Sequence, residues 1–369
     1  MTEPTEHLSF SAPLADYAEQ AEALLRAVQR GDDAARWAFK WQHPRYKDLP
    51  GSAVDAKSLT LAEARLVVAR QYHLEDWSHL SNFVDAVQVD ANVQAFERAV
   101  EYVVDGELEK LNKALLADAD LVTRRSTRMH RATLLHYVAA NGVEDGRQRT
   151  PANAVAIADA LLSSGADPDA LAHMYGEDCT TMSMLVSSSH PAQAGVQSAL
   201  IETLLDHGAN LYGPGSKWQD GIITALAFGF VDAARTLQRR SGAVDSAVAA
   251  AGLGMNDDLK RLLPVADAEN VQAALTLAAM HGNRDAVEVL LDAGADPSAY
   301  NPNGFHSHCT PLHQAIWFGH ADIVRLLVGR GADLTVMDTI YEGTPLDWAI
   351  HAERDEIAAY LREVDAPAT

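Results

Sequence analysis

The chain has 369 residues, of which 48% are hydrophobic and 22% are charged, and these proportions exclude disorder over most of its length. It carries 29 Lys and Arg against 51 Asp and Glu, so it lacks the clustered cations with which proteins bind nucleic acids or anionic lipid. Two cysteines, Cys179 and Cys309, are too few for a disulfide framework and form no CxxC pair for zinc.

The first seven residues include two glutamates and lack the basic and apolar regions of a signal peptide. No run of about 18 apolar residues occurs that would span a membrane. We therefore expect a protein of the reducing cytoplasm that binds neither nucleic acid nor membrane.

The N-terminal region, residues 1–90, has the hydrophobic period of helices and contains no longer repeat. Helices are predicted over residues 14–30, 33–41 and 61–72 and after Asp76. Thr60 and Glu63 form the sequence pattern of a capping box at the start of the third helix. Pro and Gly residues predict a loop over residues 43–51.

From residue 91 onward, one pattern recurs along the chain. Thr-Pro-Leu occurs at Thr310 and again 34 residues later at Thr344, and Gly-Ala-Asp occurs at Gly294 and 37 residues later at Gly331. Thr is a good N-cap and Pro suits the first helical position, whereas Gly after a Leu-Leu pair ends a second helix. Each unit is therefore predicted to contain two helices joined by a turn, followed by a loop.

This pattern resembles the ankyrin repeat, which has about 33 residues and a Thr-Pro-Leu-His-x-Ala signature. The resemblance implies an all-α solenoid of seven or eight helix-turn-helix units with finger loops over residues 91–365. Residues 1–90 then form an N-terminal helical cap, and residues 61–80 resemble the helical leader of a group of bacterial ankyrin-repeat proteins. As a family, ankyrin-repeat proteins are binding scaffolds, so the resemblance implies a protein partner in a concave groove.

Two histidines in one predicted finger loop, His306 and His308, are candidate binding residues. In an extended loop, side chains two positions apart point to the same side, so these two imidazoles are in place to ligate a divalent metal. Since no third ligand is fixed by spacing, hydrogen bonds to neighbouring fingers are the alternative, and we predict neither a metal nor a cofactor. His136 and His313 occupy the His of the signature, where a structural hydrogen bond between units is expected.

Alignment of the last two units on their Thr-Pro-Leu segments predicts an aromatic patch. Trp317, Trp348 and His351 occupy first-helix positions that face the groove in an ankyrin unit, and Tyr341 stands beside them in a finger. Trp and Tyr are enriched among the residues that anchor protein partners, so this patch is a candidate binding site. Filling of the space between helices is the alternative role of the Trp residues.

Long insertions at 141–152 and 187–195 and several other titratable residues suggest a second function. Asp178, His190 and Glu342 are candidate catalytic residues for a hydrolase or lyase that acts on a polar metabolite such as a sugar. Arg147, His173 and Tyr175 are the corresponding candidates for binding the ligand. Because 51 acids place some carboxylates in loops by chance, solvated surface acids are the alternative interpretation.

The sequence thus favours a cytoplasmic scaffold that holds a protein partner, and a partner of basic character is expected because the chain is acidic. An enzyme or small-molecule receptor is the alternative. The scaffold predicts an open groove with dispersed polar groups, whereas the enzyme predicts a pocket on which the finger histidines, tyrosine and carboxylates converge.

Overall fold

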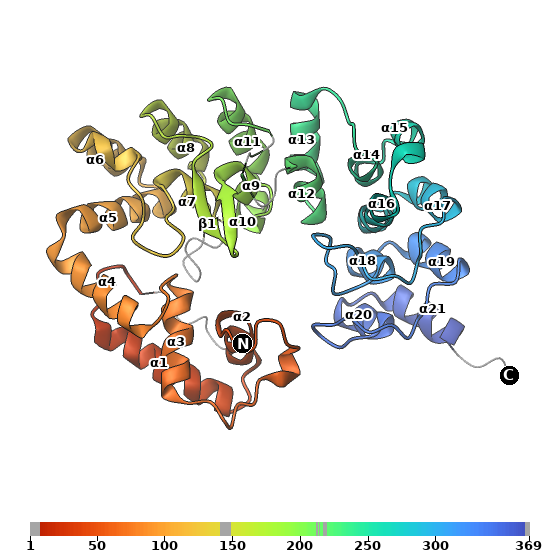
Figure 1. Cartoon of the computed structure of the whole chain (residues 1–369), viewed down its shortest axis with the longest axis horizontal. Coiled ribbons are helices and arrows are strands. Elements are labelled where there is room, and N and C mark those ends of the chain that lie inside the picture. The colour runs from red at the N-terminus through yellow and green to blue at the C-terminus, as the bar shows by residue number, and fades with distance from the viewer. Residues whose placement is uncertain (1–7, 141–148, 212, 214, 217–219, 366–369) are drawn as a thin grey trace. The chain divides into compact units, whose positions relative to one another are not determined.

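A computed structural model describes residues 8–140, 149–211, 213, 215–216 and 220–365 (Figure 1). Nearly all regular elements are α-helices. The chain divides into two compact units, residues 1–221 and 222–369, which are described one at a time.

The N-terminal unit begins with the four predicted helices, α1 (Leu14–Gln29), α2 (Asp33–Gln42), α3 (Leu61–Gln71) and α4 (Trp77–Val89). The capping box predicted for α3 is present: Glu63 N–H donates to Thr60 Oγ1, and Thr60 N–H donates to Glu63 Oε2 over 2.8 Å. Asp76 caps α4 by accepting the His79 N–H. These side chains satisfy N–H groups that have no partner within the helix, and so fix where each helix begins.

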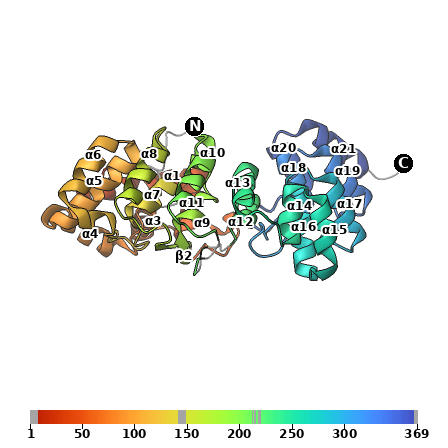
Figure 2. The same ribbon diagram turned by 90° about the horizontal axis from the view of Figure 1, so that it is seen from above.

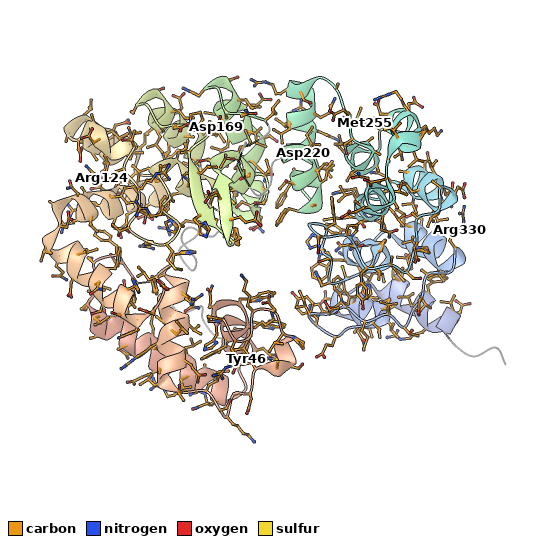
Figure 3. The ribbon with its side chains drawn as sticks, in the orientation of Figure 1. Tyr46, Arg124, Asp169, Asp220, Met255 and Arg330 are labelled. Atoms are coloured by element: carbon orange, nitrogen blue, oxygen red, sulfur yellow. The ribbon has the colours of Figure 1, made fainter. Side chains whose placement is uncertain are left out.

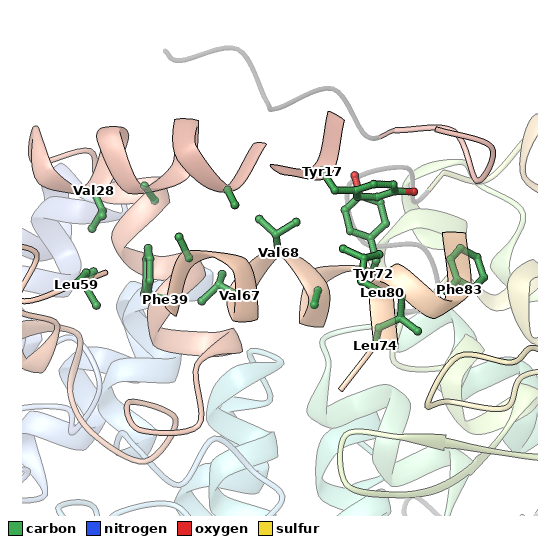
Figure 4. Close-up of a cluster of buried hydrophobic side chains, with 14 of the residues drawn as sticks. Tyr17, Val28, Phe39, Leu59, Val67, Val68, Tyr72, Leu74, Leu80 and Phe83 are labelled. Atoms are coloured by element: carbon green, nitrogen blue, oxygen red, sulfur yellow. The ribbon is translucent and has the colours of Figure 1, made fainter. Parts of the chain in front are cut away.

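A hydrophobic core joins α1 to α4 (Figure 4). Tyr17 of α1 packs edge-to-face against Tyr72, with ring centroids 4.9 Å apart, and the Tyr72 hydroxyl donates to Gln20 Oε1. Phe39 of α2 and Leu80 of α4 are fully buried in the same core. Full burial of such a side chain contributes about 2 kcal/mol.

Helix pairs fill the rest of this unit. They are built from α5 (Ala91–Asp105), α6 (Leu108–Ala117), α7 (Leu134–Ala139), α8 (Ala154–Ser163), α9 (Thr181–Leu185), the short α10 (Ser189–Gln193) and α11 (Gln197–Asp206). Before α9, β1 (Leu171–Met174) and β2 (Glu177–Thr180) form an antiparallel hairpin with His173 opposite Asp178. The segment before α9 is therefore a hairpin, and the predicted insertion at 187–195 contains α10.

A buried ion pair links α4 and α5 to the loop before α7. Arg128 Nη2 donates to Glu97 Oε2 over 2.8 Å, and the Arg128 guanidinium lies 5.1 Å from the Phe83 ring centroid. The exposed fractions of the two charged side chains are 4% and 1%. Because desolvation of two charges is costly, the close contact between them is what makes their burial tolerable.

The C-terminal unit consists of two layers of helices (Figures 1 and 2). It begins with α12 (Gly221–Ala227) and α13 (Val231–Ser241). The inner layer contains the first helix of each later pair, α14 (Ala247–Leu253), α16 (Ala268–Met280), α18 (Pro311–Phe318) and α20 (Pro345–His351). The outer layer contains the second helices, α15 (Asn256–Leu262), α17 (Arg284–Asp292), α19 (Ala321–Gly329) and α21 (Asp355–Asp365).

A histidine caps the start of one first helix in each unit. His136 Nδ1 accepts the Thr133 N–H, so its Nε2 carries the proton and donates to the Ala170 carbonyl over 3.0 Å. His313 Nδ1 accepts the Thr310 N–H in the same way. Burial lowers the pKa of both His136 and His313 to about 4, so both are neutral at pH 7.

The fingers before α18 and α20 are tied to each other by backbone hydrogen bonds. Asn301 N–H donates to the Cys309 carbonyl across the base of the first finger, and Thr339 N–H of the second finger donates to the His308 carbonyl over 2.9 Å. The side chains carried by the two loops are therefore held next to one another. None of the helices within the described residues is long and apolar enough to cross a membrane.

Candidate functional site: an aromatic pocket

The C-terminal unit contains a cavity of about 590 Å³ at the fingers and the first helices, here called the aromatic pocket. It is lined by Phe228, Met280, His306, His308, Gln314, Trp317, Phe318, Tyr341, Gly343, Asp347, Trp348 and His351. Five of these residues are Phe, Tyr or Trp, three are His and none is Lys or Arg.

A continuous series of ring contacts runs along the aromatic pocket. Its central ring is Trp348, which packs against Trp317, His308 and Tyr341 with centroid separations of 5.9, 6.1 and 6.4 Å. From Trp317 the series continues to His351, whose ring lies nearly parallel to the indole at 6.3 Å. Edge-to-face and offset stacking arrangements of this kind are favourable, so the rings hold one another in place.

The buried carboxylate of Asp338 fixes Trp348 and the finger in front of it. Trp348 Nε1–H donates to Asp338 Oδ2 over 2.9 Å, and the backbone N–H groups of Ile340, Tyr341 and Gly343 donate to the same carboxylate. Burial raises the pKa of Asp338, but these four hydrogen bonds outweigh it and hold the pKa below its usual value. Asp338 is therefore an anion at neutral pH, and it positions both Tyr341 and Trp348.

The two finger histidines line the pocket, but the loop is not extended as expected. His306 has a left-handed backbone conformation with φ +59°, and its ring lies 6.0 Å from that of His308. His306 Nε2 donates to the Ala227 carbonyl over 2.7 Å. Burial and the neighbouring His306 lower the pKa of His308, so its imidazole is neutral at pH 7.

Polar groups around the rings already have partners within the protein. Gln314 is buried and its amide donates to Cys309 Sγ, and burial raises the pKa of that thiol to about 12. Asp347 accepts the N–H and the hydroxyl of Thr344 in the capping box of α20. Burial has thus left Cys309 unreactive as a thiol, and the pocket offers mainly ring faces to a ligand.

Six of the residues predicted to bind a ligand therefore meet at one pocket, and these are His306, His308, Trp317, Tyr341, Trp348 and His351. Trp317 and Tyr341 have exposed fractions of 45% and 56%, although both are large and hydrophobic. Filling of the space between helices was the alternative role of the Trp residues, but such exposure is more typical of a binding surface. Whether these residues bind a partner stays a prediction.

The candidates in the N-terminal unit occupy a different kind of surface. His173 Nδ1 lies 3.2 Å from Asp178 Oδ1 across the hairpin, and Tyr175 has φ +55° in its turn. These side chains are about half exposed. His190 lies in α10 and is partly buried.

Two further candidates are placed as follows. Glu342 lies in the finger before α20, is exposed and has φ +58°, but does not line the aromatic pocket. Arg147 lies outside the described residues, as does most of the insertion at 141–152. Within the described residues, no group of three or more His, Cys, Asp or Glu side chains is arranged to hold a metal ion. The catalytic roles of Asp178, His190 and Glu342 therefore stay predictions.

Sequence reasoning did not identify Phe228, Met280 and Phe318 as pocket residues. Phe228 ends the segment before Gly229 as Phe318 does before Gly319, and this repeated Phe-Gly pair is the signal from which both were identifiable. Gly229 has φ +86°, and a Cβ added there would lie 3.3 Å from Phe318. Only a glycine accommodates both this conformation and the approach of that ring.

Comparison with known proteins identifies part of the chain. Residues 247–338 match the family model for ankyrin repeats (3 copies). An ankyrin repeat-containing protein of Schizosaccharomyces pombe, P1E11.10, is 41% identical over 70 residues, which are 19% of this chain and 31% of that protein. Protein PhlB of Serratia liquefaciens is 39% identical over 72 residues, 20% of this chain and 30% of that protein.

A further relative, ankyrin repeat and SOCS box protein 6 of Mus musculus, is 40% identical over 81 residues, 22% of this chain and 19% of that protein. The matched segments thus span less than a third of the length of each of these relatives. The predicted all-α ankyrin-repeat fold is confirmed. Since the family model begins at residue 247, the bacterial leader and the division at residue 90 stay predictions, as does the number of units.

Proposed function

We propose that the chain is a binding protein that holds a protein partner on the finger and first-helix surface of its C-terminal unit, with the aromatic pocket as the anchor. The family resemblance supports a protein partner. The observation that carries the proposal is that Trp317 and Tyr341 are kept exposed at the edge of a preformed pocket. Exposed aromatic rings that border a pocket are typical centres of binding energy.

The geometry of the pocket favours binding of a partner without rearrangement. Asp338 holds Trp348 and the Tyr341 finger by four hydrogen bonds, and His306 is tied to the Ala227 carbonyl. Side chains that are already ordered lose little conformational entropy when a partner binds. A rigid pocket of about 590 Å³ accommodates one or two side chains of a partner.

Pocket variants of the full chain test this proposal. Trp317→Leu and Tyr341→Leu remove exposed rings from the pocket. Tyr360→Leu is the control because Tyr360 is partly exposed in α21 of the same unit and does not line the pocket. Proteins captured from an extract of the source cells are identified, purified and titrated against each variant. We expect both pocket variants to weaken the specific complex about tenfold or more, and the control to leave it unchanged. A partner that binds all three variants alike would refute the proposal.

A second candidate function, a receptor for a small molecule, is favoured by the cavity volume, which lies in the range of small-ligand sites. A thermal-shift screen of sugars, sugar acids and nucleotides tests it, because a ligand that binds the folded state raises the unfolding temperature. A ligand that stabilises the wild type and not Trp317→Leu would support a receptor. Hydrolase or lyase activity through Asp178, His190 and Glu342 is tested separately by turnover of any ligand found.

We also infer a reducing compartment such as the cytoplasm. Cys179 and Cys309 are the two cysteines of the chain; both are buried and they form no disulfide with each other. Buried thiols without a disulfide partner are common in proteins that stay in reducing surroundings.

A further inference from the structure

We propose that the aromatic pocket receives the cationic side chain of a Lys or Arg from a basic segment of the partner. This inference rests on the proposed function and adds the chemistry of the residue that enters the pocket. It is carried by the ring faces, by a buried carboxylate next to them and by the separation of positive and negative charge within the C-terminal unit.

The rings provide a surface to which organic cations bind. The face of an aromatic ring is negative, so an ammonium or guanidinium group within about 6 Å of the ring centre is attracted to it. The Trp348 ring centroid lies 5.9 Å from that of Trp317 and 6.4 Å from that of Tyr341. A cation in the pocket therefore reaches several ring faces at once, and Trp is the residue that binds cations best.

Asp338 adds a negative charge directly behind the central ring. Its carboxylate accepts the Trp348 indole N–H over 2.9 Å, and this hydrogen bond raises the electron density of the ring. Asp338 as a residue is 2% exposed. It is shielded from water, so its field acts on the pocket through the protein and is screened less by salt than that of a surface acid. Asp347 adds a second carboxylate to the lining.

One titratable group that faces the pocket has lost its positive charge through its surroundings. His308 is neutral because burial and His306 lower its pKa. His306 uses Nε2 as a donor to the Ala227 carbonyl, and His351 stacks on Trp317. Arg354, at the start of α21, directs its guanidinium to the Trp317 carbonyl at the end of α18, with Nη2 at 2.8 Å. This arginine offsets the partial negative charge at the C-terminus of α18 and does not line the pocket.

Positive residues are absent from the sequence of this whole surface. Residues 262–283, 296–320 and 331–353, which include the fingers and first helices that form the pocket, contain no Lys or Arg. Three arginines in or next to the outer helices pair with acids: Arg284 with Glu288, Arg325 with Glu356 and Arg330 with Asp292.

Those arginines border a separate cavity between α17 and α19, and Arg330 lies on the outer side of the unit (Figure 3). Positive charge is thus found on the outer layer, and aromatic rings with carboxylates on the inner one. An apolar partner residue such as Phe would contact the rings but would not be stabilised by the negative charge of this surface. A cationic residue uses both, and attraction by the acidic surface speeds its approach.

The test uses short peptides and the full chain. Seven-residue peptides Gly-Ser-Gly-X-Gly-Ser-Gly carry Arg, Lys, citrulline, norleucine or Phe at X, so that citrulline and norleucine are neutral counterparts of Arg and Lys. Binding is measured on the indole N–H resonances of the 6 Trp residues, with Trp317 and Trp348 assigned from variants. Millimolar titrations detect weak binding that is confined to one side chain.

We expect the Arg and Lys peptides to shift the Trp317 and Trp348 resonances and to bind about fivefold more tightly than their neutral counterparts. Added salt should weaken binding of the charged peptides more than that of the norleucine peptide. Trp317→Leu and Tyr341→Leu should each reduce the affinity for the Arg peptide about threefold or more, whereas Tyr360→Leu should leave it unchanged. Because both replaced rings are about half exposed, these variants keep the core intact.

The outcomes separate this inference from the proposed function. If the norleucine or Phe peptide bound as tightly as the Lys and Arg peptides and lost affinity in Trp317→Leu, the inference of a cationic side chain would be overturned. The proposal that the pocket anchors a partner would still be supported. Absence of any saturable shift of the Trp resonances with the Arg and Lys peptides would also overturn the inference that the pocket receives a cationic side chain. In that case the proposed function is decided by the partner titrations alone.

Discussion

Trp348 donates its indole proton to a carboxylate ten positions earlier in the chain, that of Asp338. This contact connects the finger before α20 to the helix that follows it, and the same carboxylate accepts three backbone N–H groups of the finger. The conformation of the loop and the position of the central ring of the pocket therefore depend on one side chain.

Replacement of that carboxylate should destabilise the C-terminal unit. In Asp338→Asn, the amide NH2 group faces N–H donors and leaves some of them unpaired, so we expect a loss of about 2–4 kcal/mol in the free energy of unfolding. Urea unfolding followed by Trp fluorescence measures the loss. Asp333→Asn, at an exposed turn, is the control and should cost less than about 1 kcal/mol. Equal losses in the two variants would contradict this role of Asp338.

Much of the pocket was predictable because the repeat superimposes residues that lie 34 positions apart. Alignment on Thr310 and Thr344 brought Trp317, Trp348 and His351 to one surface, and the structure places them in one series of ring contacts. The helices of residues 1–90 were equally accessible, since capping signals and hydrophobic period are local properties.

Contacts between distant positions were not predictable. Phe228 reaches the pocket from α12, and its ring lies 6.3 Å from that of His306, which is 78 residues later in the chain. No local pattern in the sequence sets this distance. The left-handed conformation of His306 is likewise imposed by hydrogen bonds within the finger and to Ala227, so the expected extended loop was wrong. Four-residue strands such as β1 are too short for a period to identify.

Stability should fall as the pH is lowered from about 6.5 to 4. Burial lowers the pKa of His136 and His313 from 6.5 to about 4 in the folded chain. In this range the unfolded chain binds a proton at each site and the folded chain does not, so the stabilisation present above pH 6.5 is lost as the pH falls. Each histidine contributes up to about 3 kcal/mol to this dependence.

A variant isolates the contribution of one of these histidines. His313→Asn retains an acceptor for the Thr310 N–H but does not titrate, so its stability should depend less steeply on pH between 4 and 6.5 than that of the wild type. Unfolding temperatures across this range measure the dependence. If the variant and the wild type lost stability in parallel, His313 would not be the titrating group.

Removal of half of the buried ion pair in the N-terminal unit should be costly. Arg128→Met removes the guanidinium that faces the buried Glu97 carboxylate, and we expect a loss of about 3–5 kcal/mol. The double variant with Glu97→Leu removes both charges and should recover most of that loss. Arg325→Met, which breaks an exposed pair with Glu356, is the control and should cost less than about 1 kcal/mol. Failure of the double variant to recover stability would show that packing of Arg128 on Phe83 matters more than charge.

Substitution of two glycines of the C-terminal unit distinguishes the cost of backbone conformation from the cost of close packing. Gly282 and Gly294 both have positive φ, +74° and +94°, so alanine at either position should cost about 1 kcal/mol from the backbone. A Cβ at Gly294 has no atom within 4 Å, whereas one at Gly282 would lie 2.9 Å from His320 Cε1.

That close approach should make Gly282→Ala more destabilising than Gly294→Ala by about 1–3 kcal/mol. His320 Nε2 donates to the Met280 carbonyl over 3.0 Å, so its ring cannot withdraw without loss of this hydrogen bond. In a His320→Ala background the two glycine substitutions should therefore cost the same, and urea unfolding of the four glycine variants measures this. A difference that persists without the imidazole would place the cause in the backbone at Gly282, because the side chain that crowds it would be gone.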